Sequence, residues 1–159
     1  METRWHSCRP LPVVERMDSV VRVEIRQQPF SPWAELEQWG GDAAADAVFL
    51  GRVRGKTMDG RTLQALELEH YAGLCEQCIK TSAQTLLSEY EADGALVLHR
   101  VGRLLPGDVI VLVAVHADRR GAALNCCAAL LEDLKHDAPF WKREWCDGQG
   151  TWLASNTPR

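Results

Sequence analysis

The sequence has no apolar run long enough to cross a bilayer and no recognisable secretory signal. Its longest apolar run, residues 109–115, is far shorter than the ~20 residues that a membrane helix requires. Near the N-terminus, charged residues and prolines interrupt any apolar segment: Arg4, Arg9, Pro10, Pro12, Glu15 and Arg16. The lack of both features predicts a cytoplasmic location.

The sequence also lacks the spacings that mark disulfide frameworks, zinc sites and nucleotide-binding loops. Six cysteines are present, but without a secretory signal we expect reduced thiols. Cys75 and Cys78 have no second CxxC or nearby histidine pair to complete a tetrahedral zinc site, so we interpret them as apolar residues of a buried helix face. No GxGxxG or P-loop spacing occurs. We therefore expect neither a bound metal nor a cofactor.

The chain has no basic surplus. Its formal net charge of -4 argues against a general nucleic-acid binder, whose surface is usually basic. The basic residues are nevertheless clustered, at Arg52, Arg54 and Lys56, at Arg119 and Arg120, and at Lys142 and Arg143. Such clusters in an acidic protein favour a local site for a small anion. The alternative, a solvated charged surface, is favoured for any single cluster taken alone.

Hydropathy patterning predicts one α+β domain. Hydrophobic residues make up 46% of the 159 residues and charged residues 25%, as is typical of globular proteins. Period-two alternation and helical spacing predict strands at 21–26, 47–54, 63–70, 95–101 and 109–116, helices at 32–39, 73–90 and 121–135, and a short strand or loop at 142–153. Because hairpins outnumber crossovers in this order, we expect a mostly antiparallel sheet packed with helices.

Strand-like alternation begins only after Met17. We therefore expect residues 1–16 to form a disordered N-terminal extension and residues 17–159 to form the single domain. The segment 109–116 has little polar alternation, which favours a central position in its sheet. The helix at 121–135 is predicted to place Leu124, Cys127, Leu131 and Leu134 on one face.

The segment Arg119-Arg120 lies where a buried strand ends and this last helix begins. Free backbone N–H groups at a helix N-terminus favour anions, and two guanidinium groups strengthen that preference. Ordinary surface charge is the alternative. However, arginines at this end of a helix oppose the helix dipole, and this unfavourable placement points to an anionic ligand.

Lys135 follows at the other end of the helix, where a lysine is ordinary because it complements the dipole. The next segment, HDAPFWKRE, changes that interpretation. Pro139 fixes the chain direction, Phe140 and Trp141 supply apolar anchors, and Lys142 and Arg143 project as a cationic pair. Such a loop can hold ammonium groups in a partly desolvated pocket, where the pKa of a lysine falls and its amine becomes usable in catalysis.

His99 and Arg100, on the strand at 95–101, are candidates for a supporting role behind the site. A strand histidine is more often structural than catalytic. Glu67 and Glu69 are interpreted as a polar strand face only.

Five motifs resemble the large, catalytic subunit of molybdopterin synthase, the MoaE family. They occur in the family's order and span about residues 20–153. The last is highly specific, whereas the others are weak singly. They are FLGRVRG (Phe49–Gly55), LELEHY (Leu66–Tyr71), LHRVGRLLPGD (Leu98–Asp108), ADRRGAAL (Ala117–Leu124) and DLKHDAPFWKRE (Asp133–Glu144).

The resemblance implies an α/β-hammerhead-like fold and a sulfurtransferase of molybdenum cofactor synthesis. In that family two large subunits form a central homodimer, and a small ubiquitin-like subunit docks at each end to give a heterotetramer. The C-terminal Gly-Gly tail of the small subunit, carried as a thiocarboxylate, enters a pocket of the large subunit. Sulfur is then transferred to cyclic pyranopterin monophosphate to form the dithiolene of molybdopterin.

Carried over residue by residue, the resemblance implies that Lys135 and Lys142 are the catalytic pair. The substrate contacts that it implies are Arg52, Val53, Arg54, Arg119, Arg120, Arg143 and Glu144. One position departs from the family, which usually has His-Arg where this chain has Arg119-Arg120. The change keeps positive charge but removes an imidazole that titrates near neutral pH.

Two other classes of function remain as alternatives. A non-catalytic module that binds a phosphate ligand or a partner's acidic C-terminal tail would explain the arginines without needing both lysines. RNA binding is disfavoured by the acidic balance and the lack of aromatic stacking motifs.

Overall fold

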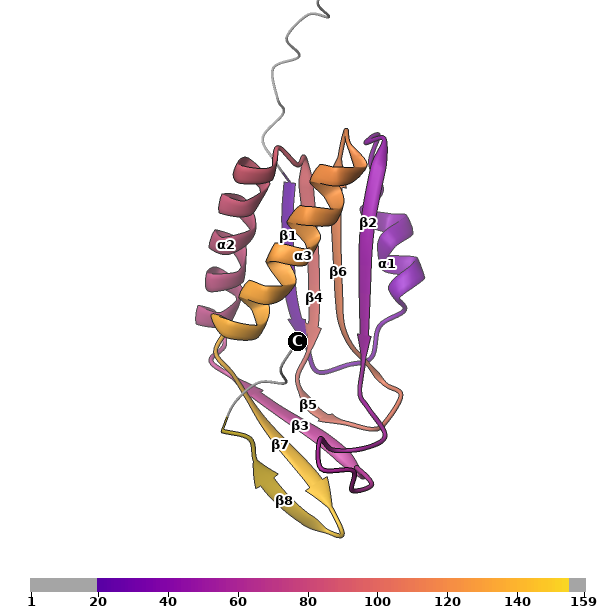
Figure 1. Cartoon of the computed structure of the whole chain (residues 1–159), viewed down its shortest axis with the longest axis vertical. Helices are drawn as coiled ribbons and strands as arrows, with labels where there is room; N and C mark the ends of the chain where they lie inside the picture. The colour runs from indigo at the N-terminus through magenta and orange to yellow at the C-terminus, as the bar shows by residue number, and fades with distance from the viewer. Residues whose placement is uncertain (1–19, 155–159) are drawn as a thin grey trace, which may run out of the picture.

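The computed structural model describes residues 20–154, so the extension expected at residues 1–16 lies outside the described residues. Three helices and two four-stranded sheets form the domain (Figure 1). In chain order the elements are β1 (Val20–Arg26), α1 (Pro32–Trp39), β2 (Ala45–Arg52), β3 (Ala65–His70), α2 (Leu74–Tyr90), β4 (Gly94–Arg100), β5 (Gly102–Leu104), β6 (Val109–Ala117), α3 (Arg120–His136), β7 (Phe140–Cys146) and β8 (Gln149–Trp152).

The first sheet has the strand order β1-β4-β6-β2 and forms the centre of the molecule. β1 runs parallel to β4, and the other pairs are antiparallel. β6 is central, as its continuous apolar run predicts. Side chains alternate between the two faces: Val97 and Val113 pack under α2 and α3, whereas Leu98 lies on the opposite face, which α1 covers.

The second sheet, with the order β5-β3-β7-β8, is fully antiparallel and lies beyond one end of the first (Figure 1). A small separate core lies on its inner side, formed by Val53, Leu63, Leu68, Val101, Leu104 and Cys146. The α+β class with mostly antiparallel sheets is therefore confirmed.

The helix predicted at 32–39 is confirmed with those bounds, whereas other local expectations are wrong. Ser31 caps α1 by accepting a hydrogen bond from the Ala34 amide at 3.5 Å, and Pro32 is the first helical residue. The sequence did not predict β5, whose three residues are too few to show a period. The expected strand or loop at 142–153 is instead the hairpin β7–β8, which starts at Phe140 because that residue pairs with His70.

The predicted helix face at 121–135 is wrong for Leu124, which is 60% exposed. α3 turns Ala123, Cys126 and Leu130 toward the first sheet instead. The helix-face interpretation of the CxxC pair is confirmed for Cys75, which is fully buried, whereas Cys78 is half-buried. Burial raises the pKa of the Cys75 thiol to about 12, so this residue is protonated at neutral pH.

Within residues 20–154 no helix is both long and apolar enough to cross a membrane.

Candidate active site

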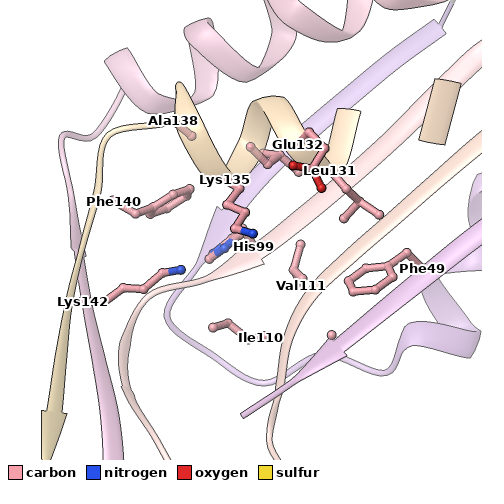
Figure 2. A pocket seen from close by; sticks show the side chains of 12 residues that line it. Phe49, His99, Ile110, Val111, Leu131, Glu132, Lys135, Ala138, Phe140 and Lys142 are labelled. Carbon is pink, nitrogen blue, oxygen red and sulfur yellow. The ribbon is translucent and has the colours of Figure 1, made fainter. Parts of the chain in front are cut away.

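A cavity of about 340 Å³ opens where the C-terminal end of α3 and the start of β7 meet the first sheet. Figure 2 shows the side chains of Lys135 and Lys142 entering it from two different elements. Its walls are mostly apolar. The lining residues are Phe49, Gly51, His99, Ile110, Val111, Leu131, Glu132, Leu134, Lys135, Ala138, Phe140 and Lys142.

The local sequence explains how the two lysines converge. α3 ends at His136, so Lys135 occupies its last turn, and Pro139 prevents the helix from continuing. The chain then turns into β7, where Leu68 of β3 pairs with Lys142. In a strand, successive side chains point to opposite faces. Lys142 therefore points toward the first sheet and into the cavity.

The cavity changes the chemistry of Lys142. Burial lowers the pKa of its ammonium group, and the nearby positive charge of Lys135 lowers that pKa further. Both effects disfavour the charged form of an amine. Lys142 is therefore easier to deprotonate than an ordinary surface lysine, as an acid–base or nucleophilic role requires.

His99 forms part of the cavity wall itself, although the sequence suggested a place behind the site. The residue is only 8% exposed. Its ring stacks on Phe140, with centroids 4.1 Å apart, and its Nδ1 lies 2.8 Å from the carbonyl oxygen of Arg100. Burial is the main cause that lowers the pKa of His99 to about 4. The imidazole is thus neutral at pH 7.

Arg100 lies outside this cavity and is 6% exposed. Its guanidinium donates to the carbonyl oxygen of Gln27 at 3.1 Å and lies 3.6 Å from the carboxylate of Asp108. Asp108 in turn accepts a hydrogen bond from the Leu105 amide. Arg100 therefore stabilises the turn at 105–108, a supporting role.

A second cavity, of about 130 Å³, lies beside the first and shares Lys142 and Ile110 with it. The segment Arg52, Val53 and Arg54 lines it, together with Lys56 and Glu144. Arg52 donates to the Gly107 carbonyl at 3.2 Å, and the Val53 amide donates to the backbone carbonyl oxygen of Asp108 at 2.9 Å. The turn that Arg100 stabilises thus holds the arginine segment in place. Four cationic side chains and one carboxylate line the second cavity, so it suits an anion.

Three predicted contacts do not reach this site within one chain. Arg143 follows Lys142 and so points to the other face of the second sheet. There its guanidinium lies 2.8 Å from Glu67 and contacts the rings of Trp145 and Trp152, at 4.9 and 4.6 Å from their centroids. Arg119 and Arg120 stand at the N-terminal end of α3. At a rise of 1.5 Å per residue, Arg120 is about 22 Å from Lys135 along the helix.

Sequence reasoning missed the apolar walls and Glu132. The walls come from β2, β6 and α3: Phe49, Ile110, Val111, Leu131 and Leu134. Helical spacing could have placed Leu131, Glu132 and Lys135 together, because residues three and four apart share a helix face. Nothing local in the sequence places Phe49 near them, since β2 and α3 are far apart in the chain.

Comparison with known proteins points to one family. The model of the MoaE protein family matches residues 25–137. A molybdopterin synthase catalytic subunit from Ralstonia nicotianae is 40% identical over 134 residues, which cover 82% of this chain and 76% of the relative. Molybdopterin cofactor biosynthesis protein E from Burkholderia multivorans has the same fold, with a TM-score of 0.71, 33% identity, and coverage of 87% of this chain and 90% of that one.

A complex of subunits 1 and 2 of molybdopterin-converting factor from Helicobacter pylori also shares the fold. Its TM-score is 0.71 at 22% identity, over 84% of this chain and 92% of that one. The family match spans more than half of the sequence, and the Ralstonia relative exceeds 30% identity over most of it. Together with the paired lysines and the cationic cavity, these matches show that the chain belongs to the MoaE family.

Proposed function

We propose that this chain is the catalytic subunit of a molybdopterin synthase that acts in the cytoplasm. It would transfer sulfur from the thiocarboxylated C-terminus of a small ubiquitin-like partner to cyclic pyranopterin monophosphate, forming the dithiolene of molybdopterin. One observation carries the proposal. Lys142 stands at the boundary between an apolar cavity that holds Lys135 and a cationic cavity lined by Arg52 and Arg54.

The two cavities suit the two reactants. The first is mostly apolar, which fits a Gly-Gly tail that has no side chains and ends in a reactive group. The second presents Arg52, Arg54 and Lys56, which fit the cyclic phosphate of the pterin through charge-assisted hydrogen bonds. The thiocarboxylate and the pterin would therefore meet at Lys142.

The lysines would supply the acid–base and electrostatic chemistry of the transfer. Attack by the thiocarboxylate sulfur would join the tail to the pterin through sulfur, and water would then attack the acyl carbon and release the tail as a carboxylate, leaving sulfur on the pterin. These steps require proton transfers and place negative charge on oxygen. The lowered pKa of Lys142 makes its proton easier to release than that of an ordinary lysine, which suits an acid–base role. Lys135, in the last turn of α3, would stabilise negative charge that develops in the first cavity.

Arg119 and Arg120 would act in a second copy of the chain. They lie too far from Lys135 to reach the same pocket, and they stand beside the exposed Leu124. A homodimer in which α3 of one copy reaches the pocket of the other would bring them to the phosphate. The dimer would thus complete both sites and form the centre of a heterotetramer.

Reconstitution tests the proposal. The purified chain, the thiocarboxylated partner and the pterin substrate should together yield molybdopterin, and the partner should co-purify as a small protein ending in Gly-Gly. The chain with an unmodified partner is the control and should form no dithiolene. Tight binding of the partner and the pterin without dithiolene formation would instead favour the non-catalytic module.

Subunit mixing tests the second-copy role of the arginines. Lys135→Ala and Arg120→Ala should each be nearly inactive alone, but mixed dimers should recover partial activity because one pocket then has both groups intact. No recovery in mixtures that demonstrably contain heterodimers would contradict the shared site.

A further inference from the structure

His99 is a buried titratable residue in the wall of the first cavity, and the proposed chemistry assigns it no task. It is the last but one residue of β4 and lies opposite Val111 of β6. Its ring stacks on Phe140 at 4.1 Å. The same cavity contains Lys142 and Lys135, and Figure 2 shows all three nitrogen-bearing side chains directed into it.

The hydrogen bond at Nδ1 fixes the tautomer of the ring. The carbonyl oxygen of Arg100, 2.8 Å away, can only accept, so Nδ1 must carry the proton. Burial, together with the positive charge of Lys142, lowers the pKa of His99 to about 4, which keeps the ring neutral. A neutral imidazole protonated at Nδ1 presents an unprotonated Nε2, which is a hydrogen-bond acceptor.

Charged and titratable groups surround the ring from three elements. α3 contributes Lys135 and Glu132 to the cavity wall, and β7 contributes Lys142. His70 of β3 acts on the ring electrostatically. Two of these groups are ammonium donors in a partly desolvated space. A neutral acceptor there differs in its effect on a lysine from either an anion or a cation. A carboxylate in its place would hold a lysine firmly protonated, whereas a second cation would repel it.

We propose that His99 is a positioning residue that presents Nε2 as a neutral hydrogen-bond acceptor to the Lys142 ammonium group. The bond orients the amine toward the junction of the two cavities. It also stabilises the protonated form without adding charge, so the amine keeps a proton to donate. Its importance for turnover rests on the proposed function, whereas the hydrogen bond itself does not.

Competitive acetylation of lysines tests the hydrogen bond without any substrate. Only the neutral amine reacts, so the rate for Lys142 at a fixed pH reports its pKa, and mass spectrometry of the peptide gives that rate. In His99→Phe the acceptor is lost, the pKa of Lys142 falls further, and the acetylation rate should rise about tenfold. His99→Gln can place an amide oxygen near the position of Nε2 and should restore a rate within about twofold of wild type.

Val111→Ala is the matched control, because Val111 pairs with His99 in the sheet and lines the same cavity but has no polar side-chain atom. It should leave the pH profile of Lys142 acetylation unchanged. An equal response of His99→Phe and Val111→Ala, or of His99→Phe and His99→Gln, would overturn the proposal. Circular dichroism confirms that each variant is folded.

The wild-type chain supplies a test that no folding defect can affect. Nitrogen NMR of the imidazole should show His99 neutral at pH 7, with the proton on Nδ1 and Nε2 unprotonated. A protonated Nε2 would overturn the proposal outright.

Turnover by the reconstituted complex then separates the two proposals. His99→Phe should lower kcat and leave KM within about twofold, with the activity profile shifted toward acid, and His99→Gln should restore both. If the wild-type complex were inactive while the acetylation and NMR results were as expected, the proposed function would be contradicted and the positioning role would still stand. Full activity of His99→Phe with an unshifted profile would reject the positioning role alone.

Discussion

Lys142 and Arg143 are neighbours in β7 with the same formal charge, yet the fold gives them opposite environments. Lys142 points inward to the junction of two cavities, where burial and Lys135 lower its pKa. Arg143 points outward, and its pKa is raised by its hydrogen bond to Glu67. The pleat of one strand thus separates a cation that lines the cavity from one that packs on the outer face of the second sheet. In this account the inner face of β7 carries the chemistry and the outer face holds the second sheet together.

The largest expected effect comes from Lys135→Ala. Removing the amine should lower dithiolene formation by about 10³-fold, within the range for loss of an acid–base or electrostatic group, while the melting temperature stays near that of wild type. Lys80→Ala, in the middle of α2 and outside both cavities, is the control and should be fully active. Near-normal turnover by Lys135→Ala would remove this residue from the chemistry.

The next effect concerns pH and Lys142. Because the folded pKa of this amine is lowered, the unfolded chain binds more protons between that lowered value and the ordinary value of 10.5. Stability should therefore rise with pH across that window. Lys142→Met should remove the rise and melt higher than wild type at pH 7, while losing activity. Melting curves of the wild type and Lys142→Met from pH 6 to about 10 measure this rise in stability. If the melting temperatures of the two proteins changed with pH in parallel, the burial of the ammonium group would be contradicted.

A smaller effect is expected for the cationic cavity. Arg54→Ala should raise the KM for the pterin about tenfold and change kcat little, because a lost charge-assisted hydrogen bond to phosphate weakens binding. Arg103→Ala removes an arginine from the outer side of the second sheet, where it lies over Trp145, and should leave that KM unchanged. Equal changes in KM for both variants would place the phosphate elsewhere.

The smallest effect is expected for Arg119→His, which restores the residue usual in the family. Positive charge near this position suits a phosphate, and in the variant the neighbouring Arg120 still supplies that charge. Turnover should stay within about twofold of wild type between pH 6 and 8. An inactive Arg119→His variant would show that Arg119 has a role particular to this chain.

The sequence predicted the class of the fold and a partly desolvated pocket around Lys135 and Lys142, because both depend on local signals. Alternation and helical spacing placed most elements. The two lysines are only seven residues apart in the sequence, so one short segment contains both. The sequence could not show which of the clustered cations point into the cavity. Arg143 looked equivalent to Lys142 until the pairing of β7 with β3 fixed which face each occupies.

The remaining errors arose where long-range contacts decide. Phe49 and Val111 reach the cavity from β2 and β6, and no local pattern brings those strands to α3. β5 is held by its pairing with β3, and no intrinsic propensity of its own marks it. Arg119 and Arg120 are a different case, because family resemblance groups them with Lys135 whereas α3 places them at its opposite end. Their contact with the substrate stays a prediction that requires a second copy of the chain.

The most direct test compares Lys142→Gln with Arg143→Gln in a single-turnover assay of dithiolene formation, with the same thiocarboxylated partner. Both changes remove one positive charge from adjacent residues of β7. We expect Lys142→Gln to lose at least about a hundredfold in rate, whereas Arg143→Gln should stay within about threefold and show only a lower melting temperature. Equal losses of rate in the two variants, or a greater loss in Arg143→Gln, would contradict the assignment of the chemistry to the inner face of β7.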